Sequence, residues 1–365
     1  MVKRFFESQN KPACLHEKKF CPFRDEQQAT TVIDGYRLPG IIDTHFHGAF
    51  GWDFVFGNPA KLDEMMSKVA ASGITGLFPT LITCSEEQRL QALADIARLH
   101  KTRKALPIIH GIYLEGPFLA PSKRGSHPED CLLKPSIALL EKWQKAADGL
   151  IKIITVAPEL PGAMEFITMA TSMGITVSLG HSAADWQTTE KAISCGARHV
   201  THLFNAMPAI HHREAGMLSS ILTRQNLNVE LIGDCEHVAP EIISMIYRLY
   251  DNRRLLLVSD SVAPSGLPDG EYNFYNNNLT SRNCRCCLPG GSLFGGCTLL
   301  ADCLKRLQKE TSLSRAVLED SVWQTPCNAL KIPLPDTEVF FDTRMNWLAS
   351  RFEQTWYHGE STDNA

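Results

Sequence analysis

The sequence predicts a (β/α)₈ barrel of the TIM type, with a small β-rich appendage built from both termini. Three observations lead to this fold class. Short apolar runs bounded by turn residues recur along the chain, segments with helical periodicity lie between them, and together they span roughly 250 residues. A βα unit repeated eight times over this length favours a closed barrel over an open sheet.

Eight apolar runs are expected to form the barrel strands. Several are almost continuously apolar, such as IIHGIYLEG, IKIITVAPE and LLLVSD, which is typical of parallel strands covered on both faces. In chain order, the predicted strands cover residues 41–47, 74–83, 108–116, 151–159, 176–181, 199–204, 229–234 and 255–260.

Helices are expected between these strands. Asn58-Pro59, Ser85 and Pro240 are suitable caps or first residues of helices. The glycines placed just past helix ends, where a left-handed conformation is wanted, are Gly73, Gly174 and Gly196. The predicted helices cover residues 59–72, 85–101, 135–147, 163–173, 184–195 and 240–250.

The two ends of the chain fall outside this repeat. Residues 1–39 show little periodicity and no clear strands, while the tail carries a β-like TEVFFD and an aromatic stretch. We expect the barrel to cover residues 40–329, and residues 1–39 and 330–365 to form the appendage, a reduced β-sandwich. The irregular segment 273–291 is expected to be a long loop or hairpin.

Composition narrows the class of protein. With 44% hydrophobic and 21% charged residues, the chain reads as an ordinary soluble globular protein, so neither disorder nor a membrane partner is expected. A net charge of -4 offers no polybasic field for nucleic acid. Scattered cysteines and an N-terminal stretch without a signal-peptide apolar run predict a cytoplasmic protein. Cys284, Cys286 and Cys287 are expected to be reduced surface thiols, because no second Cys/His pair follows at zinc-finger spacing.

Five predicted strands end in residues that bind metals or move protons. Each residue alone could be a hydrogen-bonded core histidine or a helix cap, but the C-terminal ends of barrel strands meet at one mouth, so five coincident ends favour a metal site. The His-x-His pair follows the strand period of two, which points both imidazoles to one side. These residues are His45, His47, Glu115, His181, His202 and Asp260.

Imidazole and carboxylate ligands suit a divalent metal, with zinc foremost and iron, cobalt or manganese as alternatives. Three protein ligands leave a position open for water, whose pKa the ion lowers toward ~7. A carboxylate not fully committed to the ion can then shuttle protons. The predicted reaction class is metal-assisted hydrolysis.

Longer motifs follow one another from residue 39 to about residue 266. They are LPGIIDTHFHG, GITGLFPTLIT, YLEGPF with KRGSHP, VAPEL, VSLGHS, THLFNAM with HHREAG, GDCEHV and VSDSVAPSG. In these motifs, their order and their spacing, the chain resembles the N-acetylglucosamine-6-phosphate deacetylases of the amidohydrolase superfamily. LEGPF and THLFNAM are highly specific together, whereas His-x-His marks only the superfamily. The match continues weakly to about residue 330.

The resemblance implies a role for each residue of the metal site. Asp260 would be the general base that activates water and then protonates the departing amine. His45 and His47 can support a second ion, so one or two divalent ions per chain are expected. The residues that would hold the main ion are Glu115, His181 and His202.

The resemblance also implies a sugar-phosphate site. Arg213 and His237 would bind the phosphate, and one of them would reach across from the neighbouring subunit of a homodimer. Phe294 departs from the family pattern, which has a small polar residue in this substrate-closing segment. The full set of implied substrate contacts is Ser126, His127, Asn205, Ala206, Arg213, His237, Leu293, Phe294 and Gly295.

The implied activity is hydrolysis of N-acetylglucosamine 6-phosphate to glucosamine 6-phosphate and acetate, in amino-sugar catabolism. One alternative is an amidohydrolase acting on another amide. The subclass with a carboxylated lysine is disfavoured, because the fourth strand ends in Val-Ala-Pro-Glu with no lysine. A second alternative is a decayed homologue that binds sugar phosphate without turnover. The altered chain ends and Phe294 motivate it, but every metal-type residue is retained.

Overall fold

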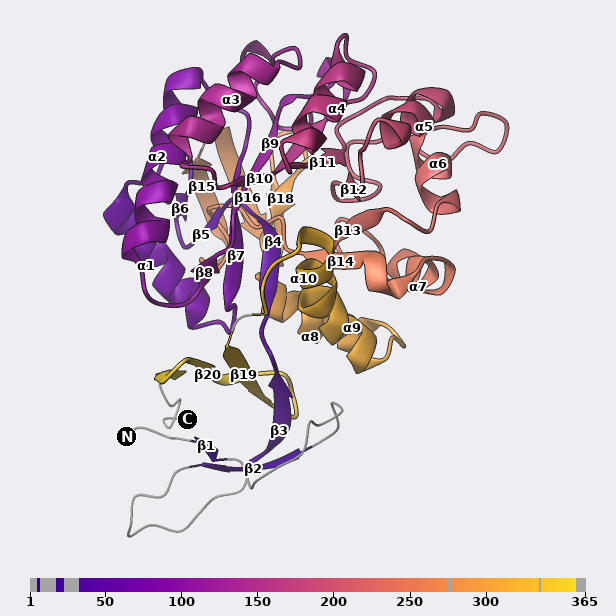
Figure 1. Ribbon diagram of the computed structural model, residues 1–365. Coiled ribbons are helices and arrows are strands. Elements are labelled where there is room, and N and C mark those ends of the chain that lie inside the picture. Colours follow the sequence, from indigo (N-terminus) through magenta and orange to yellow (C-terminus); the bar gives the residue numbers. More distant parts are fainter. Residues whose placement is uncertain (1–4, 7–17, 23–32, 275–276, 335, 359–365) are drawn as a thin grey trace.

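The computed structural model describes residues 5–6, 18–22, 33–274, 277–334 and 336–358. Eight parallel strands pair in chain order into a nearly closed barrel, which confirms the predicted fold class (Figure 1). The last strand reaches the first through a bridge between Phe46 and Ser261, and the Asp260 N–H donates to the His45 carbonyl at 3.0 Å. The barrel strands are β4 (Ile42–Phe46), β7 (Gly76–Leu81), β9 (Ile112–Phe118), β10 (Ile151–Val156), β11 (Thr176–Leu179), β12 (His199–Val200), β13 (Asn228–Ile232) and β14 (Leu255–Val258).

The helices, most of which form an outer ring around the barrel, include the six predicted ones and others that the sequence did not reveal (Figure 1). The Asn58 side chain caps α1, and Ser85 forms a capping box with Gln88 at the start of α2. The helices are α1 (Pro59–Ala70), α2 (Glu86–Thr102), α3 (Ile137–Ala146), α4 (Ala163–Ser172), α5 (Trp186–Ser194), α6 (Met217–Thr223), α7 (Pro240–Leu249), α8 (Leu300–Glu310), α9 (Arg315–Val322) and α10 (Gln324–Leu330). Helix α6 and the run from α8 to α10 were missed.

Strands from both ends of the chain form one antiparallel sheet, as predicted for the appendage. Tyr36 pairs with Phe341 where β3 meets β19, and Phe341 joins the main hydrophobic core. The expectation of no clear strands before residue 40 was wrong, because these strands are short and lack a long alternating pattern. The division of the chain at residues 40 and 330 stays a prediction. The sheet strands are β1 (Phe5–Phe6), β2 (Lys18–Pro22), β3 (Ile33–Leu38), β19 (Thr337–Asp342), β20 (Trp347–Phe352) and β21 (Thr355–His358).

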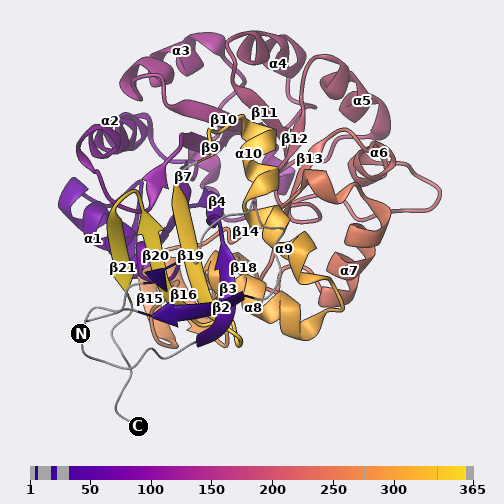
Figure 2. The same cartoon turned by 60° about the horizontal axis from the view of Figure 1, so that its bottom comes forward.

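The N-terminal end of the barrel is plugged. Figure 2 shows α10 lying across this end. The hydroxyl of Tyr113, a residue of this plug, bonds to Thr155 Oγ1 at 3.0 Å and to Thr201 Oγ1 at 2.9 Å. Side chains therefore fill the barrel interior at its N-terminal end, which leaves the C-terminal ends of the strands for a site. The plug residues are Ile42, Phe78, Tyr113, Ile153, Trp323 and Cys327.

The described residues of segment 273–291 lie within a four-stranded antiparallel sheet, so the hairpin in the loop-or-hairpin expectation is confirmed. Cys286 is buried against Leu279 and Phe294, which corrects the expectation of a surface thiol; the strand pattern that buries it was not visible in the sequence. This sheet consists of β15 (Gly270–Phe274), β16 (Asn277–Arg282), β17 (Arg285–Cys287) and β18 (Leu293–Gly296). The remaining strands are β5 (Gly48–Ala49), β6 (Trp52–Asp53) and β8 (Ile108–Ile109), which pairs with β7. Within the described ranges, no helix has the length and apolar character needed to cross a membrane.

His110, between β8 and β9, is expected to make stability fall in acid. Its Nε2 is buried without a hydrogen-bond partner among the described residues, and burial lowers the pKa of the imidazole from its ordinary 6.5 to about 4. Between pH 6.5 and about pH 4, His110 is protonated in the unfolded chain but neutral in the folded chain. Acid therefore favours unfolding across this window. Linkage limits the resulting loss of unfolding free energy to about 3 kcal/mol. Because the His110 side chain is partly exposed, we expect a loss of about 1–2 kcal/mol.

Denaturant unfolding of wild type and His110→Phe at pH 7.5 and 4.5 checks this expectation. The variant should lose about 1–2 kcal/mol less than wild type on acidification. His212→Phe, at an exposed histidine, is the matched control. Equal acid losses in wild type and His110→Phe would exclude His110 as the cause.

Candidate metal centre

The ligand-type residues from five strand ends converge at the C-terminal mouth of the barrel. Glu115 lies on β9, whereas His181, His202 and Asp260 follow the last residues of β11, β12 and β14. They border a cavity of about 160 Å³. The predicted meeting of these strand ends at one mouth is confirmed.

The first group of ligand atoms is formed by Glu115, His181 and His202, all of them buried. The Nε2 atoms of His181 and His202 lie 3.0 and 2.9 Å from the same oxygen, Glu115 Oε1, and 3.1 Å from each other. His181 Nδ1 lies 2.8 Å from the Lys123 carbonyl, which can only accept. In the neutral ring, Nδ1 therefore carries the proton and Nε2 points a lone pair at the carboxylate.

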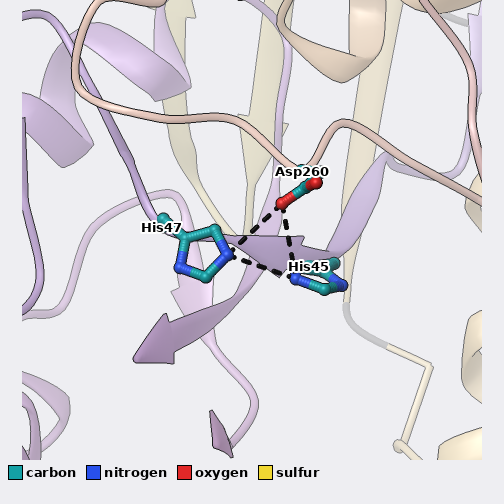
Figure 3. A group of neighbouring side chains, drawn as sticks. All are labelled: His45, His47 and Asp260. Carbon is teal, nitrogen blue, oxygen red and sulfur yellow. Dashed lines mark hydrogen bonds and ion pairs between the residues drawn. The ribbon is translucent and has the colours of Figure 1, made fainter. Parts of the chain in front are cut away.

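The second group is formed by His45, His47 and Asp260, which are also buried. Figure 3 shows the two imidazoles and the carboxylate turned toward one another. The two Nε2 atoms are 3.2 Å apart, and Asp260 Oδ1 lies 3.5 Å from His45 Nε2 and 3.3 Å from His47 Nε2. Glu115 connects the groups, because its Oε2 lies 3.2 Å from His47 Nε2 while its Oε1 faces the first group.

These side chains fit a divalent cation. Lone pairs and carboxylate oxygens face one another in both groups, so positive charge is needed between them. The pKa of His47 reflects the same need: burial lowers this pKa, but hydrogen bonds to Asp260 and Glu115 outweigh burial and raise it to about 9. The nitrogen and oxygen donors are those that zinc, iron, cobalt and manganese accept.

Asp260 is a carboxylate at neutral pH. Burial raises its pKa, but the charge of His45 and the hydrogen bond with His47 outweigh burial and lower the pKa to about 2. The side chain also borders the cavity, where a substrate can reach it. A proton acceptor thus lies beside both ligand groups.

The backbone at the strand ends is strained. His181, His202 and Asp260 have φ values of 48°, 23° and 51°, in the left-handed region that residues other than glycine seldom adopt. Gly296 of β18 supports Asp260 by donating its N–H to the Asp260 carbonyl at 2.7 Å, and a Cβ there would meet the Ser259 carbonyl oxygen at 2.1 Å. Only glycine permits this approach, a role that the Gly295-Gly296 pair could have indicated.

Most of the predicted substrate contacts border the same cavity. His127 also touches the first group: the Thr83 N–H donates to its Nδ1 at 3.3 Å, so its Nε2–H faces Glu115 Oε2 at 3.2 Å. Burial lowers the pKa of His127 to about 4, which keeps the ring neutral. The predicted residues that line the cavity are Ser126, His127, Asn205, Ala206, His237, Leu293, Phe294 and Gly295.

Arg213 is the predicted substrate contact that lies outside this cavity. It is exposed on the loop between β12 and α6, and its Nη1 lies 2.8 Å from His212 Nε2. The structure of one chain therefore does not bring Arg213 to the ligand groups of that chain.

Two carboxylates that the sequence analysis missed hold site histidines in place. Glu230 Oε2 lies 2.9 Å from His45 Nδ1, and Asp234 Oδ2 lies 2.7 Å from His237 Nδ1. Both carboxylates are fully buried. The available signal was their position in the apolar run VELIGD, because a charge that is buried there requires a partner.

Comparisons with known proteins identify the family of this chain. The model of the amidohydrolase family matches residues 36–263. The chain is 34% identical to the N-acetylglucosamine-6-phosphate deacetylase of Bacillus subtilis (strain 168), over 80% of this chain and 74% of the relative. It is also 34% identical to an N-acetylgalactosamine-6-phosphate deacetylase of Escherichia coli O157:H7, over 64% of this chain and 62% of that relative.

A solved structure extends the comparison to three dimensions. A mutant N-acetyl-D-glucosamine-6-phosphate deacetylase from Mycobacterium smegmatis, in complex with N-acetyl-D-glucosamine-6-phosphate, superposes with a TM-score of 0.83 and 27% identity. The match covers 88% of this chain and 87% of the other. The chain therefore belongs to the amidohydrolase family and, within it, to the N-acetylglucosamine-6-phosphate deacetylases.

Proposed function

We propose that this chain hydrolyses N-acetylglucosamine 6-phosphate to glucosamine 6-phosphate and acetate, as a metal-dependent step of cytoplasmic amino-sugar catabolism. The observation that carries the proposal is the pair of buried ligand groups, joined by Glu115, beside the carboxylate of Asp260. Family membership supplies the substrate class. Nothing supports a decayed homologue, because both ligand groups are complete.

The proposed cofactor is one or two divalent ions per chain, zinc foremost. The Glu115 group would hold the main ion and the His45 group the second. When bound, such an ion supplies Lewis-acid chemistry, polarising the amide carbonyl and acidifying water. Asp260 then accepts the proton of the attacking water and returns it to the nitrogen of the leaving amine. This proton transfer gives the amino sugar and acetate as products.

His237 is proposed to bind the 6-phosphate. Its Nδ1–H donates to the buried carboxylate of Asp234, which leaves Nε2 for the cavity. Burial lowers the pKa of His237, but the hydrogen bond and charge of Asp234 outweigh burial and raise it. A raised pKa favours the protonated ring, which suits a phosphate oxygen.

We propose that Arg213 completes the phosphate site of a neighbouring subunit in a homodimer. Its exposed loop also carries Ile210, which is 54% exposed. On α7, Ile242, Met245 and Leu249 are exposed at positions i, i+3 and i+7, a spacing that forms one apolar stripe on a helix. An arginine outside its own cavity and an uncovered apolar stripe both fit an interface between two copies.

Arg213→Ala should raise KM for the phosphorylated substrate. A charge-assisted pair contributes about 1.5–3 kcal/mol, or roughly ten- to hundredfold in affinity. The unphosphorylated sugar should remain an equally poor substrate for wild type and variant. Steady-state kinetics with both sugars measure the effect, with the exposed Arg253→Ala as a matched control. If wild type hydrolyses both sugars equally well, the proposed phosphate site is wrong.

The test of the function is acetate release by purified protein of known metal content. We expect turnover of N-acetylglucosamine 6-phosphate, loss of turnover on chelation, and recovery on adding zinc. N-Acetylgalactosamine 6-phosphate is the comparison substrate, because a relative carries its name. If metal-loaded protein releases no acetate from either sugar phosphate, the proposed function is excluded.

A further inference from the structure

Glu230 is a fully buried carboxylate that accepts hydrogen bonds from three directions. Its Oε2 lies 2.9 Å from His45 Nδ1 and 3.2 Å from the backbone nitrogen of His202, and its Oε1 lies 2.9 Å from His199 Nε2. It lies within β13, behind the two ligand groups and not on the wall of the cavity. Glu230 is therefore placed to act on His45 and His202 and not on a substrate.

These contacts determine which nitrogen of the His45 ring carries a proton and which one can bind an ion. A carboxylate has no proton to donate, so His45 Nδ1 must be the donor to Oε2. A neutral imidazole has only one N–H, and its Nε2 therefore presents a lone pair. That lone pair faces His47 Nε2 at 3.2 Å and Asp260 Oδ1 at 3.5 Å. Glu230 thus leaves Nε2 as the ligand atom of the ring in the neutral form that binds an ion.

One oxygen of Glu230 serves both ligand groups. Oε2 contacts the His45 ring of the second group and the backbone of His202, a member of the first. On His45, Glu230 contacts the ring that would bind the second ion. On His202 it contacts only the backbone nitrogen, whereas the His202 ring faces Glu115 through Nε2. Removing the charge of Glu230 should therefore weaken the second ion more than the main one.

We propose that Glu230 is a positioning residue for the second ion, which it favours by fixing His45 as an Nε2 ligand. This inference rests on the metal centre of the proposed function and not on the sugar substrate. The alternative is a structural role, in which Glu230 only satisfies buried donors. The two roles differ in their consequences, because a structural role would lower stability without selecting one ion.

Zinc binding to the full chain tests the proposal. Competition with a chromophoric chelator gives the Kd of each zinc ion for wild type, Glu230→Gln and His45→Ala, and the step that His45→Ala removes identifies the second ion. In Glu230→Gln we expect the second Kd to rise ten- to hundredfold, as for other groups that orient a ligand histidine. The main Kd should change by less than about threefold, because Glu230 contacts only the backbone of His202 and no ring that would hold the main ion.

The matched control is Glu190→Gln, which also removes a carboxylate with hydrogen-bonded partners, Ser220 and Arg224, but on outer helix α5. It should leave both zinc affinities unchanged. Thermal unfolding of the metal-free proteins separates loss of fold from loss of affinity. If Glu230→Gln does not fold, Glu230→Asp keeps the charge but shortens its reach, and it should show the same selective loss.

Three results separate the possible failures. Unchanged second-ion affinity in Glu230→Gln, or an equal loss of both ions, would overturn the role of Glu230. A wild-type protein that binds no zinc would contradict the metal centre itself. A wild-type protein that binds two zinc ions without releasing acetate would contradict the proposed substrate and leave the inference about Glu230 standing.

Discussion

His181→Ala and His202→Ala are each expected to remove the main ion and reduce deacetylation to background. Each substitution deletes one of the two Nε2 atoms that lie within 3.0 Å of Glu115 Oε1, which leaves only two ligands. Since an ion present at 100 to 1,000 times its Kd stabilises the folded state by about 3–4 kcal/mol, each variant should also lose that stabilisation in metal-containing buffer.

Elemental analysis after dialysis, acetate release and thermal unfolding check the three parts of this expectation. His100→Ala is the control, because His100 is exposed on the outer helix α2 and belongs to neither ligand group. Thermal unfolding in chelator should bring wild type and the two variants closer together, since the linkage contribution is then absent from all of them. Full metal content in both variants would contradict the assignment of the main ion to this group.

The metal-type residues that the sequence predicted follow from periodicity, whereas the substrate contacts follow from the family resemblance. Apolar runs ending in His, Glu or Asp predict ligands at one mouth, because parallel barrel strands share their direction. His47, His181 and Asp260 were found in this way although the strands themselves end one or two residues earlier. The ligand-type residues could therefore be predicted even where the exact strand ends could not.

The parts that the sequence did not predict depend on contacts between distant residues. The left-handed φ of His181 and Asp260 has no local signal, because strain at such positions is maintained by surrounding structure. Pairing of β3 with β19 joins residues about 300 positions apart, and neither strand is long enough to show its partner. Glu230 was missed for the same reason: its three donors come from β4, β12 and the turn after β12.

Asp260→Asn is expected to lower kcat by about 10²–10⁴ while the main ion remains bound. Asparagine keeps the shape of the side chain and the backbone bonds to His45 and Gly296, but it cannot accept a proton. Amide hydrolysis needs that acceptor when water attacks and the same proton when the amine leaves, so one substitution affects both steps. The main ion should stay, because Glu115, His181 and His202 form a group that does not include Asp260.

Turnover must be compared at equal content of the main ion, because Asp260 also belongs to the His45 group and its loss weakens the second ion. Single-turnover acetate release with metal analysis of the same sample provides this comparison, and the exposed Asp148→Asn is the matched control. His45→Ala separates the two effects: it weakens the second ion but retains the Asp260 carboxylate. If Asp260 acts as the base, Asp260→Asn must be much slower than His45→Ala. Equal rates in the two variants would instead make Asp260 chiefly a ligand and leave Glu115 or a histidine as the base.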